Sequence, residues 1–512
     1  MKIVILLLVL GLCMISCDDQ LDVLPENSLT LNNALTTPQD FESAISGVEQ
    51  KLRYTFIENS PMTQELKGFY VDEIADWVAG WSTNEYTSEE IVASNMNNWH
   101  GYYSGIAAAN AILNRVDDVS FSQERRNIYK GQALFFKAVF YLRLVQRWGN
   151  CILVKDDVIY KPTAKSPWEE VTDYAIELSG EAVDLLPEFD KMTNWKGENY
   201  ANKATPGKGA ANALLAYLCA WKAGCKYFAS NQNYDEKLLW EQVEKACTSI
   251  IGSGTYSLEP NPEAVCTSGL IENSQESIYE TINRGYEYEL SDFESMALVN
   301  LLAFYGAHYV GYPFNPFANE ETIKNSDYKI KVATVNRWFT NGDLRKEAYF
   351  YKVDELAEKA GGNAHVYKYR GITYMKESGA MCGLTQNRVW WRLADIYLLR
   401  AESRVRLGDM DGAIADLNEI RERAGAKCYE SSEDSGDLRY TIFLERQKEL
   451  LLEGHRYFDV IRNGYVNTEL KGNFGTLSVQ DIKDGALFMC IGNMAFTNNP
   501  LMRQNAYWFR RM

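Results

Sequence analysis

Residues 390–424, WWRLADIYLLRAESRVRLGDMDGAIADLNEIRERA, contain the clearest structural pattern in the chain. Apolar residues recur at steps of three and four on both sides of Gly408-Asp409, which predicts two amphipathic helices joined by a short turn. The first stripe is Trp390, Ala394, Tyr397/Leu398, Ala401 and Val405, and the second is Ala413, Leu417, Ile420 and Ala424. Small residues where two helices cross, with a glycine at the turn, are typical of tetratricopeptide-like hairpins.

Two further helix pairs precede this one. In the first pair, one helix is expected to end at Gly149 and its partner to begin near Ser166. In the second pair, one helix is expected to end at Gly224 and its partner to end before Gly252. Ser166-Pro167-Trp168-Glu169 has the sequence of a capping box. The stripes are Leu134, Ala138, Tyr141/Leu142, Val145 and Trp148; Trp168, Val171, Ala175, Leu178, Ala182 and Leu185; Ala210, Leu214, Tyr217 and Trp221; and Trp240, Val243, Cys247 and Ile250.

The spacing between the helix pairs is irregular, which excludes a uniform solenoid. Residues 252–388 and 464–512 are instead rich in Gly, Asn, Pro and aromatic residues, with short β-like runs at 278–282 and 365–369. Loops of this length are usually functional or disordered, and the aromatic content argues against disorder. The predicted fold is therefore mostly α, a tetratricopeptide-like helix-pair scaffold with long, aromatic-rich loop inserts.

The N-terminus has the pattern of a lipoprotein signal. Lys2 precedes an apolar run from Ile3 to Leu12 that is too short to span a bilayer. Met14-Ile15-Ser16-Cys17 fits a bacterial lipobox, in which Cys17 is acylated, for example with palmitate, after cleavage. Each buried methylene of such a chain adds roughly 0.8 kcal/mol of membrane affinity. We expect a signal peptide at 1–16, a lipidated tether at 17–30 and one body at 31–512, with halves at about 31–251 and 252–512.

Charge and cysteine content restrict the class of protein. The formal net charge of −17 argues against nucleic-acid binding, which requires a basic surface. The cysteines other than Cys13 and Cys17 show no CxxC spacing. Cys219 and Cys247 lie within helical apolar patterns, so we interpret these cysteines as buried small hydrophobic residues rather than a disulfide framework.

The segment Lys448–Gly464, KELLLEGHRYFDVIRNG, resembles the signature helix of the SusD/RagB family. Further resemblances follow the order of the family, at residues 21–25 (LDVLP), 108–113 (AANAIL), 343–345 (DLR), 392–402 (RLADIYLLRAE), 499–500 (NP) and 504–505 (QN). The resemblance implies a SusD-like α-α superhelix and a nutrient-binding lipoprotein of the outer membrane. It also implies a SusC-like TonB-dependent transporter as partner and no enzymatic activity. Asp18-Asp19 resembles the export signals that place such lipoproteins on the exterior face.

Residues 443–461 are predicted to form one continuous helix around this signature. Its inward stripe is Phe443, Gln447, Leu450/Leu451, Gly454, Tyr457/Phe458 and Ile461. Gly454 is expected on the buried face, where the missing side chain allows a neighbouring helix to approach closely. His455/Asp459 and Asp459/Arg462 have the spacing of helical charge pairs. We interpret this helix as architectural rather than as a Glu/His/Asp catalytic cluster.

No catalytic, metal or cofactor motif is present. The histidines His100, His308, His365 and His455 form no HExxH or other ligand pair, and no GxSxG elbow or phosphate-binding loop occurs. A glycosidase carboxylate pair depends on three-dimensional separation, and nothing in the sequence singles out one pair among 69 acidic residues. No catalytic residue, metal ligand or cofactor is therefore predicted.

Two segments, 76–86 and 284–312, combine aromatic residues with Asn, Asp or Arg. Sugars stack their C–H faces on aromatic rings and bond their hydroxyls to such polar groups. The predicted ligand-binding residues are Trp77, Trp81, Asn84, Tyr286, Tyr288, Tyr309 and Tyr312. Trp77 and Trp81 also fit a helical stripe with Tyr70 and Ile74. The alternative is therefore that either tryptophan packs in the core. The stripe Trp99, Tyr103, Ile106, Asn110 and Leu113 is expected to be an ordinary packed helix face.

The leading hypothesis is therefore capture of an oligosaccharide or polysaccharide for delivery to the transporter. Capture of peptides or glycopeptides is an alternative within the same kind of complex. A surface glycoside hydrolase and a structural adaptor are the alternatives outside it. The aromatic-rich inserts favour glycan binding over a purely structural role.

Overall fold

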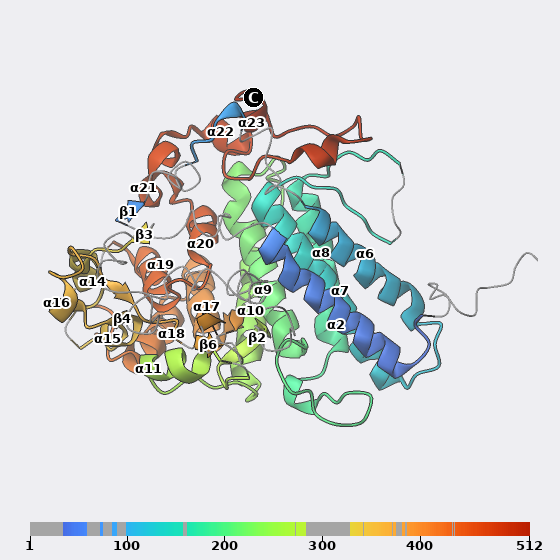
Figure 1. The fold of residues 1–512 in the computed structure, drawn as a ribbon, viewed down its shortest axis with the longest axis horizontal. Helices are drawn as coiled ribbons and strands as arrows, with labels where there is room; N and C mark the ends of the chain where they lie inside the picture. Colours follow the sequence, from blue (N-terminus) through green and yellow to red (C-terminus); the bar gives the residue numbers. More distant parts are fainter. Residues whose placement is uncertain are drawn as a thin grey trace, which may run out of the picture.

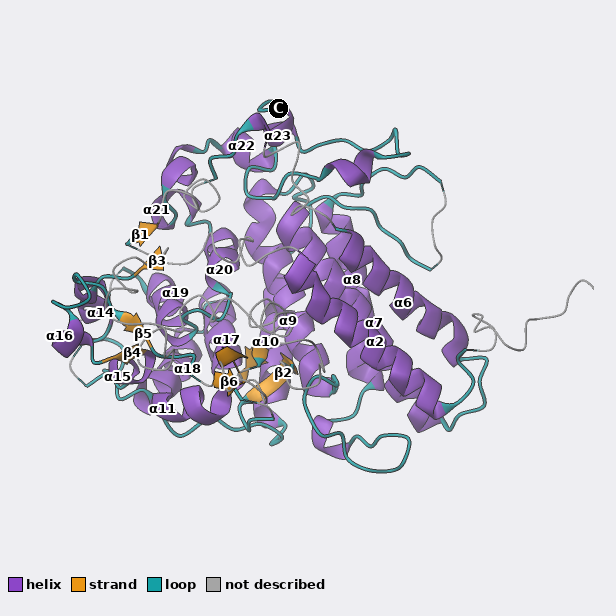
Figure 2. Cartoon of the chain, viewed as in Figure 1, coloured by secondary structure: helices purple, strands orange, loops and turns teal. Residues whose placement is uncertain are grey.

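The computed structural model describes residues 34–58, 72–74, 84–89, 99–156, 161–271, 273–282, 328–340, 342–370, 372–374, 381–384, 387–432, 434 and 436–512. Helices dominate this part of the chain (Figures 1 and 2). The longer ones are α2 (Pro38–Glu58), α6 (His100–Val116), α7 (Gln123–Trp148), α8 (Trp168–Leu185), α9 (Lys208–Gly224), α10 (Glu236–Gly252), α17 (Leu393–Leu407), α18 (Met410–Arg423), α19 (Leu438–Glu449) and α20 (Arg456–Asn463). The mostly helical fold class is confirmed.

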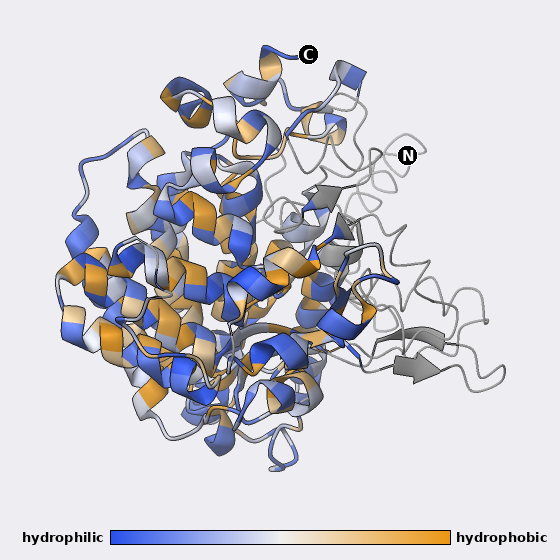
Figure 3. Cartoon of the chain, turned by 90° about the vertical axis from the view of Figure 1, so that its left-hand side faces the viewer, coloured by the Kyte–Doolittle hydropathy of each residue, from blue (hydrophilic) through white to orange (hydrophobic). Residues whose placement is uncertain are grey.

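The long helices form one continuous stack in which each packs on its neighbours in sequence. The order of packing is α2 on α6, then α7, α8, α9 and α10, followed by α17, which contacts α18 and α19. α10 and α17 are in direct contact although residues 253–392 separate them in the chain. The insert therefore leaves the stack and returns without interrupting it. Figure 3 shows apolar and polar residues alternating along the same helices, as this packing requires.

The predicted helix limits of the first pairs agree with the structure. α7 begins after Ser122, whose hydroxyl accepts a hydrogen bond from the Arg125 amide at 3.2 Å, and it ends at Gly149, where φ is +69°. Only glycine adopts such a conformation without strain. α9 and α10 end at Gly224 and Gly252. Gly224 also marks a close crossing, because a Cβ there would lie 2.5 Å from the Arg462 carbonyl oxygen.

The insert contains short elements and a small core of its own. Strand pairing is antiparallel throughout the described residues: β1 (Glu73–Ile74) with β3 (Tyr328–Lys329), β2 (Ser277–Thr281) with β8 (Arg388–Arg392), β4 (Phe350–Tyr351) with β5 (His365–Val366), and β6 (Ile372–Tyr374) with β7 (Met381–Leu384). The helices here are α11 (Pro262–Ala264), the π-helical turn η5 (Val265–Gly269), α14 (Val332–Trp338), α15 (Arg345–Tyr349) and α16 (Val353–Leu356). The β2–β8 pair closes the base of the insert and leads directly into α17.

Short helices connect and terminate the stack. They are η3 (Phe189–Lys191), η4 (Cys225–Phe228), α21 (Val466–Glu469), η7 (Gly472–Thr476), α22 (Val479–Lys483), η8 (Asn493–Phe496) and α23 (Ala506–Phe509). The last residues contribute to the main core, since Tyr507 and Trp508 are buried against it. The C-terminal segment is therefore part of the packed body.

Trp390 does not belong to a helix, contrary to the sequence prediction. It lies on β8, and α17 begins at Leu393. Trp390 remains buried, and its indole nitrogen donates a hydrogen bond to Thr281 on β2 at 3.4 Å. Residues four positions apart share a face in a strand as well as in a helix. The step from Trp390 to Ala394 therefore did not show that Trp390 lies on a strand.

The capping box predicted at Ser166 is also absent. α8 begins at Trp168, with Pro167 at the N-cap position and no capping side chain there. Ser166 instead forms a β-bridge with Cys151, and the Asn150 side-chain oxygen accepts a hydrogen bond from the Trp168 amide at 2.9 Å. Asn150, which is 18 residues away in the sequence, therefore accepts the hydrogen bond that a local cap would have accepted.

The predicted continuous helix over 443–461 is wrong, because it breaks between α19 and α20. Leu452 and Gly454 have φ values of +64° and +89°, which a helix does not accommodate. Gly454 thus permits a turn rather than a helix crossing. The carbonyl of Glu449 at the end of α19 accepts hydrogen bonds from Arg392 at 2.8 Å and Lys368 at 3.0 Å. Side chains from β8 and the insert therefore satisfy the carbonyl that the break exposes.

The described cysteines other than Cys428 agree with the predicted burial. Among the described residues, the free cysteines Cys151, Cys219, Cys225, Cys247, Cys266 and Cys490 are buried, and Cys428 is exposed. No helix within the same residues has the length and apolar character needed to cross a membrane. Cys17 and the rest of the predicted signal peptide and tether lie outside the described residues.

Candidate functional site

Most of the predicted ligand-binding residues lie outside the part of the chain that the structure describes. These residues are Trp77, Trp81, Tyr286, Tyr288, Tyr309 and Tyr312. Asn84 is described and is only 2% exposed. Its side-chain amide donates a hydrogen bond to the Ala486 carbonyl at 3.0 Å, and its own carbonyl accepts one from Asn473 at 3.4 Å. In this structure Asn84 fastens its segment to the C-terminal region.

Described residues that flank the two aromatic segments meet in the β1–β3 pair. Glu73 and Ile74, which precede the segment 76–86, pair with Lys329 and Tyr328, which follow the residues 283–327. Asp72 strengthens the junction, because its carboxylate accepts hydrogen bonds from the Lys331 amide at 2.5 Å and the Thr334 hydroxyl at 2.9 Å. Chain positions more than 250 residues apart are thereby held side by side.

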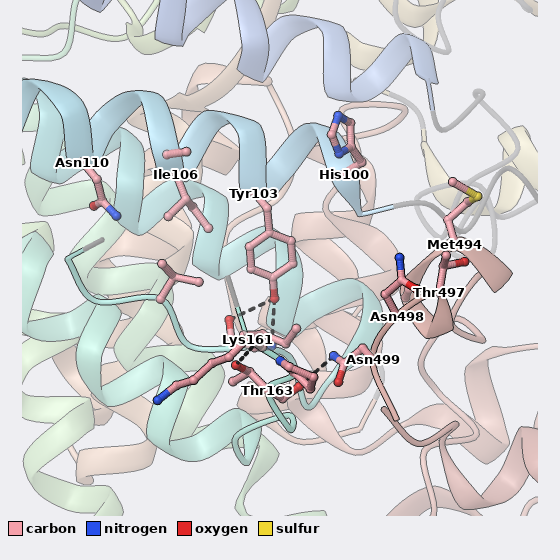
Figure 4. A pocket seen from close by; sticks show the side chains of 15 residues that line it. His100, Tyr103, Ile106, Asn110, Lys161, Thr163, Met494, Thr497, Asn498 and Asn499 are labelled. Carbon is pink, nitrogen blue, oxygen red and sulfur yellow. Dashed lines mark hydrogen bonds between the residues drawn. The ribbon is translucent and has the colours of Figure 1, made fainter. Parts of the chain in front are cut away.

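A pocket of about 500 Å³ lies elsewhere, against α6. Its walls come from α6, from residues 152–154 and 161–163 that follow α7, and from η8 and the residues after it (Figure 4). The lining residues are His100, Tyr103, Ile106, Ala107, Asn110, Ile152, Val154, Lys161, Pro162, Thr163, Met494, Ala495, Thr497, Asn498 and Asn499. This volume falls within the roughly 300–1,000 Å³ typical of small-molecule sites.

Hydrogen bonds fix the pocket walls to one another. The Tyr103 hydroxyl donates to the Ile152 carbonyl at 2.9 Å and accepts from the Ile152 amide at 2.8 Å. The Asn499 amide donates to the Thr163 carbonyl at 2.9 Å. These bonds join all three elements, so the pocket is formed by the fold itself rather than by a ligand.

The pocket was not anticipated from the sequence. Tyr103, Ile106 and Asn110 were expected to be an ordinary packed helix face, and Trp99 is indeed buried. Three members of that stripe line the cavity instead. A signal was available, because Asn110 is the one amide in an otherwise apolar and aromatic stripe. Such a residue requires a partner, and the sequence does not show which element supplies it.

The signature region around α19 and α20 contains a dense network of buried charges. Arg392 contacts Glu276 at 2.7 Å, Glu449 at 2.8 Å and Glu453 at 2.7 Å. Arg345 and Arg446 form equivalent buried clusters, the latter bridging Asp395 and Asp459 at 2.8 Å each. The network links the insert, β8 and both helices of the signature region.

Glu453 and Asp459 of this network are held in their ionised form. Burial opposes ionisation of Glu453, but Arg392 and Lys368 outweigh it and lower its pKa to about 2. The same balance against Arg446 and Arg462 lowers the pKa of Asp459 to about 2. A carboxylate with so low a pKa is a poor proton donor at neutral pH. The network therefore supports the architectural interpretation of the signature segment.

His455 belongs to the same cluster. Burial lowers its pKa, and its Nδ1 lies 3.1 Å from the Tyr217 hydroxyl, which in turn contacts Asp395 at 2.6 Å. The predicted pair of Asp459 with Arg462 is present at 2.8 Å. Among the described residues, no group of three or more His, Cys, Asp or Glu side chains is arranged to hold a metal ion.

Comparison with known proteins places the chain in a family. A model described as the SusD family matches residues 304–508, and one described as starch-binding and associating with the outer membrane matches residues 19–218. SusD-like protein P38 of Formosa agariphila is 22% identical over 490 residues, covering 87% of this chain and 88% of the relative.

Solved structures share the fold. A SusD homologue from Bacteroides thetaiotaomicron superposes with a TM-score of 0.76 at 20% identity, covering 92% of this chain and 98% of that one. A SusD-like carbohydrate-binding protein from Bacteroides vulgatus gives 0.61 at 18% identity, with 84% of each chain covered. Two family models in the expected order, a relative similar along most of its length and this shared fold agree. The chain is a SusD-like family protein.

Proposed function

We propose that this protein is a surface lipoprotein that binds an oligosaccharide or polysaccharide and delivers it to a SusC-like TonB-dependent outer-membrane transporter. The family descriptions support binding at the outer membrane. The carbohydrate-binding designation of the B. vulgatus protein with the same fold supports a glycan as ligand. The lipobox at Cys17 supports attachment through a lipid anchor.

The observation that carries the proposal is the β1–β3 junction. Residue 75 alone separates β1 from the segment 76–86, and residues 313–327 separate the segment 284–312 from β3, so this pair holds flanks of both segments side by side. Aromatic side chains from both segments then share one binding surface for a glycan, with Trp77, Trp81, Tyr286, Tyr288, Tyr309 and Tyr312 as its contacts. Such a surface binds sugar rings by stacking and requires no acid–base pair.

The test is a paired measurement of glycan affinity and melting temperature. Trp81→Ala and Tyr309→Ala are expected to weaken binding by about 1–3 kcal/mol, one to two decades in affinity, with little change in melting temperature. Trp390→Ala and Tyr457→Ala are the matched controls, because both rings are buried in the core. The controls should lose about 3–5 kcal/mol of stability. If Trp81→Ala unfolds the protein as they do, the assigned surface is wrong.

A panel of polysaccharides, oligosaccharides and peptides separates the ligand classes. Retention of peptides alone would replace the glycan with the peptide alternative. Conversion of a bound glycan, abolished by replacing one carboxylate, would instead make the protein a hydrolase. We expect retention of glycans without turnover.

Anchoring and partnership are tested in cells. Cys17→Ala should release the protein from the outer membrane, and wild-type protein should co-purify with the transporter from solubilised membranes. A Cys17→Ala variant that remains membrane-bound after a salt wash would contradict lipid anchoring.

A further inference from the structure

We infer that the pocket against α6 is a second ligand site, which binds one or two rings of a hydroxyl-rich sugar, neutral or carboxylated. The inference takes its ligand class from the proposed function but concerns a different place on the molecule. Figure 1 shows α6 on the opposite side of the structure from β1 and β3. None of the residues assigned to the proposed surface is among the described residues that line this pocket.

Asn110 provides the first argument. Its side chain is only 5% exposed, and neither its amide nitrogen nor its oxygen has a hydrogen-bond partner among the described residues. A buried amide without partners costs roughly 1–3 kcal/mol. Figure 4 shows Asn110 on the α6 face that also carries Ile106 and Tyr103, beside the cavity. A side-chain amide both donates and accepts, which matches a sugar hydroxyl.

Tyr103 provides the second argument, because its ring is held in place before any ligand binds. Both hydrogen-bonding capacities of its hydroxyl are used by the backbone of Ile152. Trp99 packs edge-on against it, with centroids 5.7 Å apart and an interplanar angle of 88°. A half-buried, fixed ring offers an apolar surface to the C–H face of a sugar at little entropic cost.

The charge of the lining provides the third argument. The chain has a formal net charge of −17, yet none of the described residues that line the pocket is acidic. Lys161 and His100, both exposed, are its basic members. This distribution accepts neutral and carboxylated sugars and disfavours amino sugars, since none of the described lining residues is a carboxylate that could pair with an ammonium group.

The remaining walls suit a sugar ring. The lining includes the apolar residues Ile152 and Val154 and the polar residues Thr497 and Asn498. A site with apolar walls and a few polar groups is the usual design for a small ligand whose orientation must be fixed. The competing interpretation is a solvent-filled crevice that binds no ligand. In that case the free-energy cost of the unpartnered Asn110 amide is not compensated.

The test uses the purified mature chain and free sugars. Glucose, galactose and mannose, with the corresponding uronic acids and amino sugars, are titrated and followed by saturation-transfer NMR. We expect at least one neutral or uronic sugar to bind saturably and its amino counterpart to bind more weakly. Lys161→Ala should weaken the uronic acid about threefold and leave the neutral sugar unchanged.

Two variants separate the ligand site from the crevice. Asn110→Ala should weaken binding about tenfold without lowering the melting temperature, because it removes an unpartnered amide. Asn114→Ala, the same change on the exposed face of α6, is the matched control and should leave affinity unchanged. Ala107→Trp should fill the cavity and abolish binding.

The inference is overturned if no sugar of the panel saturates, or if binding survives both Asn110→Ala and Ala107→Trp. Polysaccharide retention that depends on Trp81 would still support the proposed function in either case. Conversely, loss of polysaccharide retention with intact binding in the α6 pocket would reject the proposed surface alone.

Discussion

The helix pairs from α6 to α9 and the signature region around α19 and α20 both contain fully buried side chains. Those side chains are apolar in the helix pairs and charged in the signature region. Phe135, Phe136 and Phe140 of α7 are fully buried among apolar neighbours. Glu445, Arg446 and Glu449 of α19 are at most 1% exposed and are paired with opposite charges. The first region depends on shape and apolar area, whereas the second depends on complete sets of partners.

The difference predicts how each region responds to change. Apolar burial is lost in proportion to the group removed, and neighbouring residues compensate in part. A buried ion pair contributes little net stability as a whole, but removal of one partner leaves an uncompensated charge. The signature region should therefore be the more sensitive to single substitutions and to pH.

The largest effect is expected from Arg392→Met. The change leaves Glu276, Glu449 and Glu453 without their shared guanidinium and should lower the free energy of unfolding by about 3–5 kcal/mol. Urea denaturation followed by tryptophan fluorescence measures it. Lys237→Ala is the control, since it removes an exposed pair with Glu241 and should cost less than about 1 kcal/mol. Equal losses in the two variants would contradict the comparison.

Gly105→Ala should have the next largest effect. A Cβ at this position of α6 would lie 2.1 Å from the Phe140 ring of α7, so the helices must separate or the ring must move. Overpacking of this kind costs typically about 1–3 kcal/mol. Adding Phe140→Leu should restore part of the loss, as measured by melting temperature. An unchanged melting temperature in Gly105→Ala would show that the α6–α7 contact is not tight.

Acid should weaken the signature region selectively. The pKa values of Glu445 and Glu453 are lowered from about 4.5 to about 2, so their contribution is complete above pH 4.5 and is lost as the pH falls toward 2. Glu453→Gln should make the pH dependence of unfolding shallower across this interval. Gly105→Ala, the control, should keep the wild-type slope. Parallel slopes in wild type and Glu453→Gln would contradict the role of this carboxylate.

The smallest effects concern helix caps. Asp409 caps α18, its side chain accepting a hydrogen bond from the Gly412 amide at 3.0 Å, and Asp409→Ala should cost about 1 kcal/mol. Ser166→Ala should cost less than about 0.5 kcal/mol, because the Ser166 side chain does not cap α8 and Asn150 accepts the hydrogen bond from the Trp168 amide instead. Thermal denaturation compares the two. A larger loss of stability in Ser166→Ala than in Asp409→Ala would indicate that Ser166 caps α8, contrary to the structure.

The sequence by itself determined the helix pairs, most of their limits and the family resemblance. The stripes from Ala394 to Ala401 and from Ala413 to Ala424 arise from contacts three and four residues apart, which a single segment specifies. The stops at Gly149 and Gly408 are equally local, since both residues adopt positive φ at a helix end. Features of this kind can be predicted from the sequence because the residues of a single segment specify them.

The tertiary structure alone decided the features that depend on distant partners. Trp390 joins a strand because β2, more than 100 residues earlier, pairs with β8. The signature helix breaks where Arg392 and Lys368 take up the Glu449 carbonyl, and the pocket at Asn110 exists because the segments after α7 and around η8 close over α6. The same physical reason applies to each: hydrogen bonds and ion pairs between remote segments outweigh local helix propensity, and one segment does not specify its partners.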